Sequence, residues 1–568
     1  MTEWWANPAL LLIFGGLLLP LLGPLPRRIM SLALPAASLV LLCCLPDGES
    51  GRAVLFGLDL VTLRVDKLAF IFALIFHIAA LISAVYAWHL RDVLQHASTL
   101  VYAGAAVGAV LAGDLITMLL HWELTAISSV FLIWARRTER AYHVGMRYLL
   151  VQAGAGVLLL SGIVMRYTAT GDLAFERMTL DEPGSLMMLV AIGVKCAFPL
   201  LHNWLQDAYP EATVTGTVVL SIFTTKLAVY ALARGFAGTE ILIWIGAAMT
   251  LFPIFFAVIE NDLRRVLSYS LNNQLGFMVC GIGIGTDLAI NGAAAHAFAH
   301  IIYKSLLFMA MGAVLYRVGT VKASELGGLY KSMPWTAGLC IVGSVSISAF
   351  PLTSGFVTKS MILSAAGEEH LWLPWLILLF ASAGVLDHSG IKIPFFSFFA
   401  HDSGKRCQEA PSNMLLAMGA AAFLCIGIGV YPQPLYDLLP YAVAYSPYTA
   451  GHVITQLQLL LFAAAGFAFL YRRGWYPPEI RSLNLDSDWI YRRAAPALVG
   501  VALRGLDRLG AAWQGLLGDL ARRSLAMVGQ VQRHGAGLIG HQSTGSITAW
   551  VTGALAVLLM LSFLLGRS

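Results

Sequence analysis

Single ionisable residues lie inside apolar segments long enough to cross a bilayer, and this pattern constrains the fold more than any other sequence feature. Glu123, Lys195, Lys226, Lys304 and Lys359 each occupy such a segment. A charge at the centre of a membrane helix costs about 2.5–3.5 kcal/mol on insertion scales, so five dry, unpaired charges would cost on the order of 15 kcal/mol. Such residues are retained mainly for ion or proton pathways. The pattern therefore predicts a membrane protein that moves charge.

Composition supports an integral membrane protein. Of the 568 residues, 58% are hydrophobic and 12% are charged, and the mean hydropathy is +0.76. Soluble domains carry about 25% charged residues. The seven cysteines are scattered without a CxxC pair, so the sequence has no iron–sulfur, haem or zinc signature. We expect no cofactor and no redox centre in this chain, so a partner would have to supply any driving reaction.

Apolar windows of about 20 residues, the length that spans a bilayer, predict an all-α polytopic protein with about sixteen transmembrane helices. The segment 335–366 is too long for one plain helix, and we expect Pro351 and Gly355 to break it. The predicted crossings are residues 8–23, 29–45, 68–90, 98–112, 115–134, 146–166, 186–208, 213–235, 240–260, 266–285, 290–316, 335–366, 371–391, 413–431, 452–471 and 546–565.

Basic residues follow the odd-numbered crossings. Because cytoplasmic loops are enriched in Lys and Arg, this alternation predicts that both termini lie on the outer side. No basic region precedes the first apolar run, so we expect no cleaved signal peptide. The basic residues that define the alternation are Arg27, Arg28, Arg91, Arg136, Arg137, Arg140, Arg264, Arg265, Arg317, Lys322, Lys331, Lys405, Arg406, Arg472 and Arg473.

The stretch from about 484 to 545 has a different pattern, with apolar residues at spacings of three and four and charged residues between them. This pattern predicts an amphipathic helix along a surface, followed by a last crossing. Two interpretations stay open, a helix that rests on lipid headgroups and a lateral brace along sister membrane subunits. The apolar positions are Leu503, Leu506, Leu509, Trp513, Leu516 and Leu520.

Glu123 and Lys195 predict a charge pair inside the membrane. A carboxylate in LLHWELTAISSVFLIW needs a cationic partner or water, since a carboxylate buried alone would protonate. Pro199, four residues after Lys195, opens the helix next to the lysine, and broken helices at membrane depth line cavities and bind ions. A Glu/Lys pair that associates and separates would release protons, and Lys226 would take the proton next. The alternatives are a static ion pair for Glu123 and purely structural lysines.

A row of ionisable residues follows in the run HAFAHIIYK, where His296, His300 and Lys304 recur every four residues. They share one helix face and extend about 12 Å along its axis. Imidazoles donate and accept near neutral pH, which suits a proton wire. Two histidines four apart can also chelate a metal, but a lysine and no carboxylate accompanies them, so we expect no metal site. Lys359 follows the break at Pro351, so each broken helix has its own lysine, as an internal repeat would produce.

Several of these segments resemble the antiporter-like proton-translocating subunits shared by respiratory complex I, membrane-bound hydrogenases and Mrp-type multisubunit cation/proton antiporters. The likeness covers roughly 60–435. The segment EAPSNMLLAMGAAAFLCIGIGVYPQPLYDLLPY most resembles the group of Mrp-type D subunits, and the stretch NLDSDWIYRR is more similar to the largest antiporter-like subunit of complex I. The segments that carry the resemblance are HWELTAISSVFLIW, VKCAFPLLHNWLQDA, NDLRRVLSYSLNNQLGF, HAFAHIIYKSLLF, ELGGLYKSMPW and SAFPLTSGFVTK.

The resemblance implies two inverted five-helix repeats, each with a broken helix, joined by a central polar axis. Protons would enter one half-channel, pass along the axis and leave by the other. The chain departs from the family pattern at Gln206, which replaces a proline, and at NNQLGF, where SISQLGF is common. The family's pathway residues fall on Glu123, Lys195, Lys226, His300, Lys304 and Lys359.

Asp387, His388 and Lys392 make one crossing end unusually polar, and the mouth of a cytoplasmic half-channel is one interpretation of them.

The organisation expected from the resemblance has six parts. The parts are N-terminal transmembrane helices (1–97), a first repeat (98–235), a second repeat (236–400), C-terminal transmembrane helices (401–472), an amphipathic cytoplasmic-face segment (473–545) and a terminal transmembrane helix (546–568).

The sequence therefore predicts a proton-translocating subunit of a multisubunit cation/proton antiporter, similar to the Mrp-type D subunit, in the inner membrane of a bacterium. Its expected partners are sister membrane subunits, the lipid bilayer and protons, with Na⁺ as a candidate coupled ion and no nucleic acid. The alternatives are a proton-pumping membrane subunit of a complex I-like NADH:quinone oxidoreductase or hydrogenase, a self-sufficient ion exchanger, and a structural membrane anchor. Lysines at the broken helices count against the exchanger, because a hard cation prefers oxygen ligands.

Overall fold

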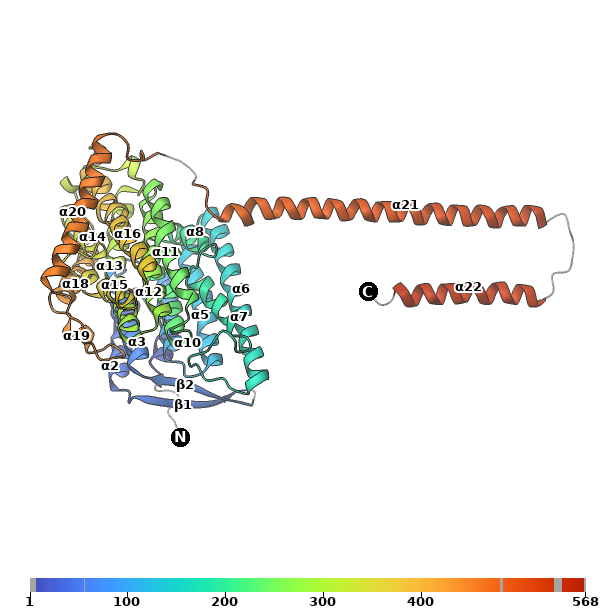
Figure 1. Cartoon of the computed structure of the whole chain (residues 1–568), viewed down its shortest axis with the longest axis horizontal. Helices are drawn as coiled ribbons and strands as arrows, with labels where there is room; N and C mark the ends of the chain where they lie inside the picture. The colour runs from blue at the N-terminus through green and yellow to red at the C-terminus, as the bar shows by residue number, and fades with distance from the viewer. Residues whose placement is uncertain (1–6, 56, 481–483, 536–543, 566–568) are drawn as a thin grey trace. The chain divides into compact units, whose positions relative to one another are not determined.

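The structure is a computed structural model that describes residues 7–55, 57–480, 484–535 and 544–565. Residue contacts divide the chain into two units, residues 1–486 and residues 487–568. Helices make up most of the first unit, which Figure 1 shows as a bundle of closely packed helices. The predicted all-α polytopic class is therefore confirmed.

The N-terminal part of the first unit contains a β-hairpin that the sequence did not predict. Its two strands pair antiparallel, with Ala53 opposite Leu60. Two backbone bonds fasten the second strand to the turn after α4, from Arg64 N to Leu111 O at 2.6 Å and from Gly113 N to Val61 O at 2.9 Å. The elements are α1 (Pro8–Leu18), η2 (Leu19–Leu21), α2 (Pro24–Cys44), β1 (Gly48–Leu55), β2 (Leu58–Val65), α3 (Lys67–Tyr86) and α4 (Val93–Val110).

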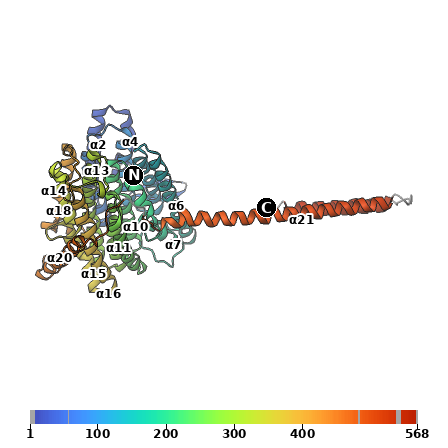
Figure 2. The ribbon, with the colours of Figure 1, turned by 90° about the horizontal axis from the view of Figure 1, so that it is seen from above.

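The rest of the first unit consists of helices joined by short loops, and Figure 2 shows them from above. From residue 115 to residue 235 they are α5 (Leu115–Trp134), α6 (Glu139–Thr170), α7 (Ser185–Lys195), α8 (Asn203–Glu211), α9 (Val214–Ile222) and α10 (Thr224–Gly235). They continue as α11 (Ile241–Ile259), α12 (Leu263–Ile284), α13 (Asp287–Val318), η3 (Ala323–Glu325), η4 (Leu329–Lys331), α14 (Pro334–Ile347), α15 (Ser354–Glu368) and α16 (Trp372–Val385). The last are η5 (Leu386–Ile391), α17 (Lys392–Pro394), η6 (Phe395–Phe399), α18 (Ser412–Val430), α19 (Gln433–Tyr436) and α20 (Ala450–Arg472).

A helix or a pair of helices covers every predicted crossing. Among the described residues, eleven helices are long and apolar enough to span a membrane, and shorter apolar helices lie at 8–21, 185–195, 334–347 and 548–560. Several predicted crossings consist of two short helices, so the predicted count of about sixteen is not confirmed.

Both predicted helix breaks are present, and they have the same backbone conformation. The four residues Ala-Phe-Pro-Leu occur at 197–200, between α7 and α8, and again at 349–352, between α14 and α15. In each copy the alanine and the leucine have positive φ angles, of 62° and 69° in the first copy and 58° and 71° in the second. Non-glycine residues rarely adopt this region, at a cost of about 1–3 kcal/mol each. The shared strain identifies the two breaks as copies of one structural unit.

The sequence predicted that Gly355 would help to break the helix, but Gly355 lies in the first turn of α15, after the break. A side chain there would overlap the carbonyl oxygen of Ser346 near the end of α14. Gly355 therefore allows the two halves of the broken helix to approach closely, while Pro351 lies in the break itself.

Contacts between distant loops agree with the charge alternation. Arg137 pairs with Asp92 at 3.6 Å, and Lys331 pairs with Asp402 at 2.8 Å. Each contact joins two loops that follow odd-numbered crossings, the side predicted to be cytoplasmic.

The second unit consists of the helical turn η7 (Ile490–Ala494) and the helices α21 (Ala495–Gly535) and α22 (Thr544–Leu565). Within the predicted amphipathic segment, residues 490–535 are helical, and α21 runs for 41 residues. Residues 481–483 and 536–543 of that segment lie outside the described residues. The apolar stripe is exposed on α21 at Leu503, Leu506, Leu509, Trp513, Leu516 and Leu520.

Two glycines bring α11 and α12 into close contact. A Cβ atom at Gly276 would lie 2.6 Å from Gly246 O and 2.6 Å from Thr250 N, both backbone atoms of α11. Backbone atoms in the middle of a helix cannot move aside individually, so an added methyl group must push the two helices apart.

We predict that Gly276→Ala destabilises the bundle by about 1–3 kcal/mol, the usual cost of overpacking. The purified protein should melt at a lower temperature in detergent. Gly419→Ala in α18 is the matched control, because a Cβ atom at Gly419 has no neighbour within 4 Å. Equal melting temperatures for the two variants would contradict the close contact.

Candidate functional site

Lys195, the last residue of α7 before the break, is completely buried against α5. Its Nζ atom donates to Trp122 O at 2.9 Å and to Thr125 Oγ1 at 2.8 Å. The same atom lies 4.0 Å from the centre of the Trp122 ring. A carbonyl, a hydroxyl and an aromatic face thus replace part of the water that an ammonium group loses on burial.

Glu123, the neighbour of Trp122 on α5, is not directly bonded to Lys195. The two groups interact electrostatically, but Glu123 Oε1 is buried without a hydrogen-bond partner among the described residues. This carboxylate lies against α6, where a side chain at Gly156 would overlap it. Glu123 and Lys195 therefore interact through the electric field and not through a direct hydrogen bond.

Lys226 lies beside a second irregularity, between α9 and α10. The backbone departs from regular helix at Phe223, with φ −90° and ψ −61°. Lys226 Nζ donates to Ser221 O at 2.6 Å, a carbonyl near the end of α9. Carbonyls at helix ends lack partners in their own helix and carry partial negative charge, so they suit a buried ammonium group.

Three ionisable residues of α13, His296, His300 and Lys304, are completely buried, and they differ in their partners. The ring of His296 lies 3.1 Å from Thr358 Oγ1 through Nδ1 and 3.2 Å from Gln274 Oε1 through Nε2. In contrast, both ring nitrogens of His300 and the Nζ atom of Lys304 have no hydrogen-bond partner in the described part of the chain. A buried polar group without a partner costs about 1–3 kcal/mol, and ordered water is the usual remedy.

Lys359 lies just after the second break and, like Lys226, bonds to a carbonyl near the end of the preceding helix. It is buried on α15, and its Nζ atom donates at 3.1 Å to the carbonyl oxygen of Ile347, the last residue of α14. The same atom lies 4.9 Å from the centre of the Phe277 ring.

These residues belong to one electrostatic network that crosses both halves of the bundle. His300 interacts electrostatically with Lys226 on α10, with Lys304 on its own helix and with Lys359 on α15. The sequence predicted these ionisable groups as a pathway but did not predict the polar side chains that complete the network. They are Thr125, Gln274, Tyr303 and Thr358. All four lie in segments that the sequence analysis quoted, but none was predicted as a site residue.

The polar crossing end at 386–399 is an irregular helix in which π-helical turns flank α17. His388 and Lys392 are buried there. Lys392 Nζ donates to Val258 O at 2.6 Å and forms an ion pair with Glu479 at 2.9 Å. Glu479 follows α20 in the chain, so the sequence spacing did not indicate this partner.

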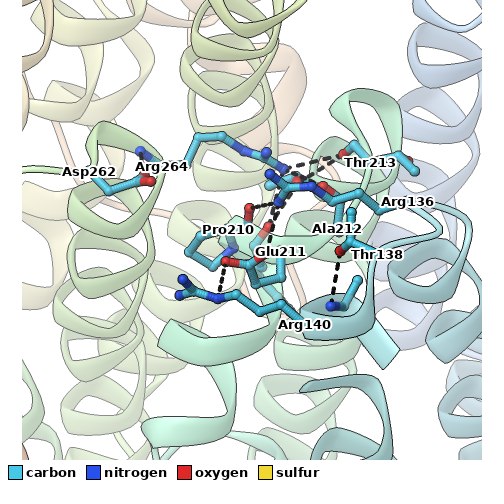
Figure 3. Close-up of polar contacts among 12 residues, drawn as sticks. Arg136, Thr138, Arg140, Pro210, Glu211, Ala212, Thr213, Asp262 and Arg264 are labelled. Atoms are coloured by element: carbon cyan, nitrogen blue, oxygen red, sulfur yellow. Dashed lines mark hydrogen bonds and ion pairs between the residues drawn. The ribbon is translucent and has the colours of Figure 1, made fainter. Parts of the chain in front are cut away.

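Arginines fasten the end of α8 to both halves of the bundle, as Figure 3 shows. Arg264, buried on α12, donates to Tyr209 O, Ala212 O and Thr213 O at 3.0–3.2 Å. From the other side, Arg136 and Arg140 pair with Glu211 at 3.0 and 2.8 Å. These charge-assisted contacts hold the carbonyl end of α8 rigidly.

A polar cavity of about 390 Å³ lies next to this cluster. One of its lining residues is Gln206, which is 2% exposed and whose two side-chain polar atoms have no protein partner among the described residues. A polar cavity of this size has room for water that would bond to Gln206, and we call this place beside the first break the wet site. Among the described residues, no group of three or more His, Cys, Asp or Glu side chains could hold a metal ion.

A multi-pass membrane bundle with buried charges beside paired helix breaks is the architecture of ion-translocating subunits. Residues 112–385 match the family described as NADH:quinone oxidoreductase/Mrp antiporter, TM. The chain is 30% identical over 355 residues to the D subunit of the Na(+)/H(+) antiporter of Alkalihalophilus pseudofirmus, across 58% of this chain and 71% of that protein. The chain therefore belongs to this family.

Two further similarities show how far the likeness extends. The chain is 29% identical over 467 residues to the A/B subunit of a probable K(+)/H(+) antiporter of Rhizobium meliloti, across 74% of this chain but only 46% of that longer protein. The fold is similar to a chain in the structure of the Mrp complex from Dietzia sp., with a TM-score of 0.70, 19% identity, and coverage of 82% of this chain and 100% of that chain.

We predict that Gly156→Ala reduces proton movement about 10- to 100-fold without lowering the melting temperature. The added methyl group would overlap Glu123 Oε1 and push this flexible carboxylate aside. A shift of about 1 Å in a reacting group can lower a rate about 100-fold. Proton uptake into proteoliposomes measures the effect. Gly154→Ala, two residues away on α6, is the control because a Cβ atom there meets nothing within 4 Å. Unchanged transport in Gly156→Ala would show that the position of Glu123 is unimportant.

Proposed function

We propose that this chain is the proton-translocating subunit of a multisubunit cation/proton antiporter of the Mrp type, similar to the D subunit of such assemblies. The observation that carries the proposal is the pair His300 and Lys304, which are buried and have no hydrogen-bond partner among the described residues. Groups that are merely structural would have protein partners, because an unpartnered buried polar group lowers stability. Two groups that depend on water can exchange protons with it.

The proposed pathway begins at Glu123 and Lys195 and ends at Lys359. A proton that reaches Glu123 neutralises its carboxylate and removes the attraction that favours a charged Lys195. The proton released by Lys195 passes to Lys226, and His300, His296 and Lys304 carry it through α13. Lys226 and Lys359 each donate to a backbone carbonyl at an interrupted helix, so a change in charge at either lysine is coupled to that interruption. Lys195 instead donates to the carbonyl of Trp122 within α5, the neighbour of Glu123.

We propose further that the chain acts with sister membrane subunits in the plasma membrane of a bacterium and that Na⁺ is the coupled ion. The Mrp complex to which its fold is similar is an assembly, and the similar Alkalihalophilus protein is named as a Na⁺/H⁺ antiporter subunit. The bundle itself favours protons over a hard cation as the species carried, because lysines occupy the breaks where carboxylates would be needed.

A second candidate function is a proton-pumping subunit of a complex I-like NADH:quinone oxidoreductase or a hydrogenase. The observation that favours it is the second unit, where a 41-residue amphipathic helix precedes another apolar helix. Copurification from membranes would distinguish the two functions. Sister antiporter subunits would support the Mrp type, whereas quinone- or NADH-binding subunits would support the respiratory type.

We predict that Lys304→Ala and Lys195→Ala each reduce coupled proton movement about 100-fold or more, since a positioned proton carrier contributes about that much. The assay is proton uptake into proteoliposomes that contain the whole complex. Lys322→Ala is the control, because Lys322 pairs with Glu325 at 3.8 Å on the half-exposed surface.

Assembly of the complex, followed by size-exclusion chromatography, separates the possible roles. Intact assembly with lost transport supports the proton pathway. Normal transport in both buried-lysine variants would refute it, and failed assembly with both would favour a structural anchor.

A further inference from the structure

Within the first unit, the chain that follows α20 packs against the helix bundle. We call its described residues 476–480 and 484–486 the strap. Tyr476 is buried, and its ring stacks on Phe396 with centroids 6.2 Å apart. The strap then places two carboxylates, Glu479 and Asp486, against buried cationic or imidazole groups.

Asp486 contacts the first broken helix. Its Oδ2 atom lies 3.2 Å from His202 Nε2 and accepts a bond of 2.8 Å from the hydroxyl of Tyr269 on α12. The side chains of His202 and Asp486 are only 3% and 5% exposed, so this contact is shielded from solvent. His202 lies directly before α8, between the break at Pro199 and the wet site at Gln206. Its second ring nitrogen, Nδ1, has no protein partner in the described part of the chain.

Glu479 contacts the second half of the bundle. It pairs with Lys392, whose side chain is completely buried, while its own side chain is 8% exposed. Burial raises the pKa of the Glu479 carboxyl, and the charge of Lys392 opposes that shift. Between the two carboxylates, Asn484 donates to Glu260 Oε2 at 3.3 Å, in the loop that joins α11 to α12.

We propose that the strap is part of the transport machinery, with Asp486 delivering protons to His202 at the first break and Glu479 positioning Lys392 at the second half of the bundle. This inference rests on the proposed function. A mere tether would need apolar contacts or exposed polar ones. The strap instead buries two carboxylates, and burial of a charge is costly unless the charge has a specific partner.

The geometry defines the proton step. A protonated Asp486 gives its proton to Nε2 of a neutral His202, which carries its own proton on Nδ1. The resulting imidazolium releases the Nδ1 proton to water, so His202 returns to neutrality with its proton on Nε2. Asp486 is left as a carboxylate that the Tyr269 hydroxyl stabilises. For the next cycle, the ring proton exchanges from Nε2 to Nδ1 through water, and the Asp486 carboxylate takes up another proton from water; no bond between heavy atoms is made or broken.

Asp486→Asn tests the relay in the complete complex reconstituted in proteoliposomes. The amide oxygen still accepts from Tyr269, so the fold is retained, but the side chain no longer carries a proton. We expect proton uptake to fall about 10- to 100-fold. Asp486→Glu should restore most of the rate, which a loss of packing would not do. The control is Asp437→Asn, an exposed carboxylate that bonds to Gln433 at 2.6 Å.

Two further variants make the outcome decisive. Asp486→Asn combined with His202→Gln should be no slower than the slower single variant, because both act in one relay. Normal transport in Asp486→Asn, or a rate that Asp486→Glu fails to restore, would overturn the relay. Lys304→Ala separates this result from the proposed function. If Lys304→Ala abolishes transport while Asp486→Asn does not, only the role of the strap fails; if Lys304→Ala transports normally, the proposed function itself fails.

Discussion

The burial of lysine ammonium groups inside an apolar bundle is the constraint on which the rest of the structure depends. An ammonium group removed from water needs acceptors from the protein, and interrupted helices supply carbonyls that no longer bond within their own helix. Lys359 uses the carbonyl of Ile347 at the end of α14, and Lys226 uses that of Ser221 near the end of α9. Irregular backbone and buried charge thus stabilise each other. At the second strained tetrapeptide this dependence is direct, because Lys359 bonds to the helix end just before it, whereas Lys195 beside the first tetrapeptide bonds to α5.

The partners of the buried groups differ between the breaks and the centre of the bundle. The lysines beside the breaks have fixed acceptors in the protein, whereas His300 and Lys304 have none among the described residues. In the proposed pathway, a fixed contact couples a charge to the position of a helix, whereas a group without a protein partner exchanges its proton with water. The strap adds carboxylates at the loop end of the same bundle.

Local sequence patterns predicted the helices and breaks well, because their causes are local. An apolar run of bilayer length and a proline that removes a backbone donor act on the segment that contains them, as at Pro199 and Pro351. The hairpin at 48–65 escaped notice because each strand has only eight residues, too few for a crossing, and half-polar positions hide its alternation. Gly355 was misplaced since its role is a close approach to Ser346, which depends on packing and not on helix breaking.

By itself, the sequence determined which residues would be charged inside a membrane and which segments would be interrupted, since both follow from side-chain chemistry along a single segment. The partners of those charges were decided only by the tertiary structure. His296 meets Thr358 across 62 residues of chain, and His202 meets Asp486 across 284. Such contacts depend on how helices pack, and the periodicity of one helix contains no information about the helix that lies against it. The charged residues of the site can therefore be predicted from single segments, whereas their partners depend on the packing of the whole bundle.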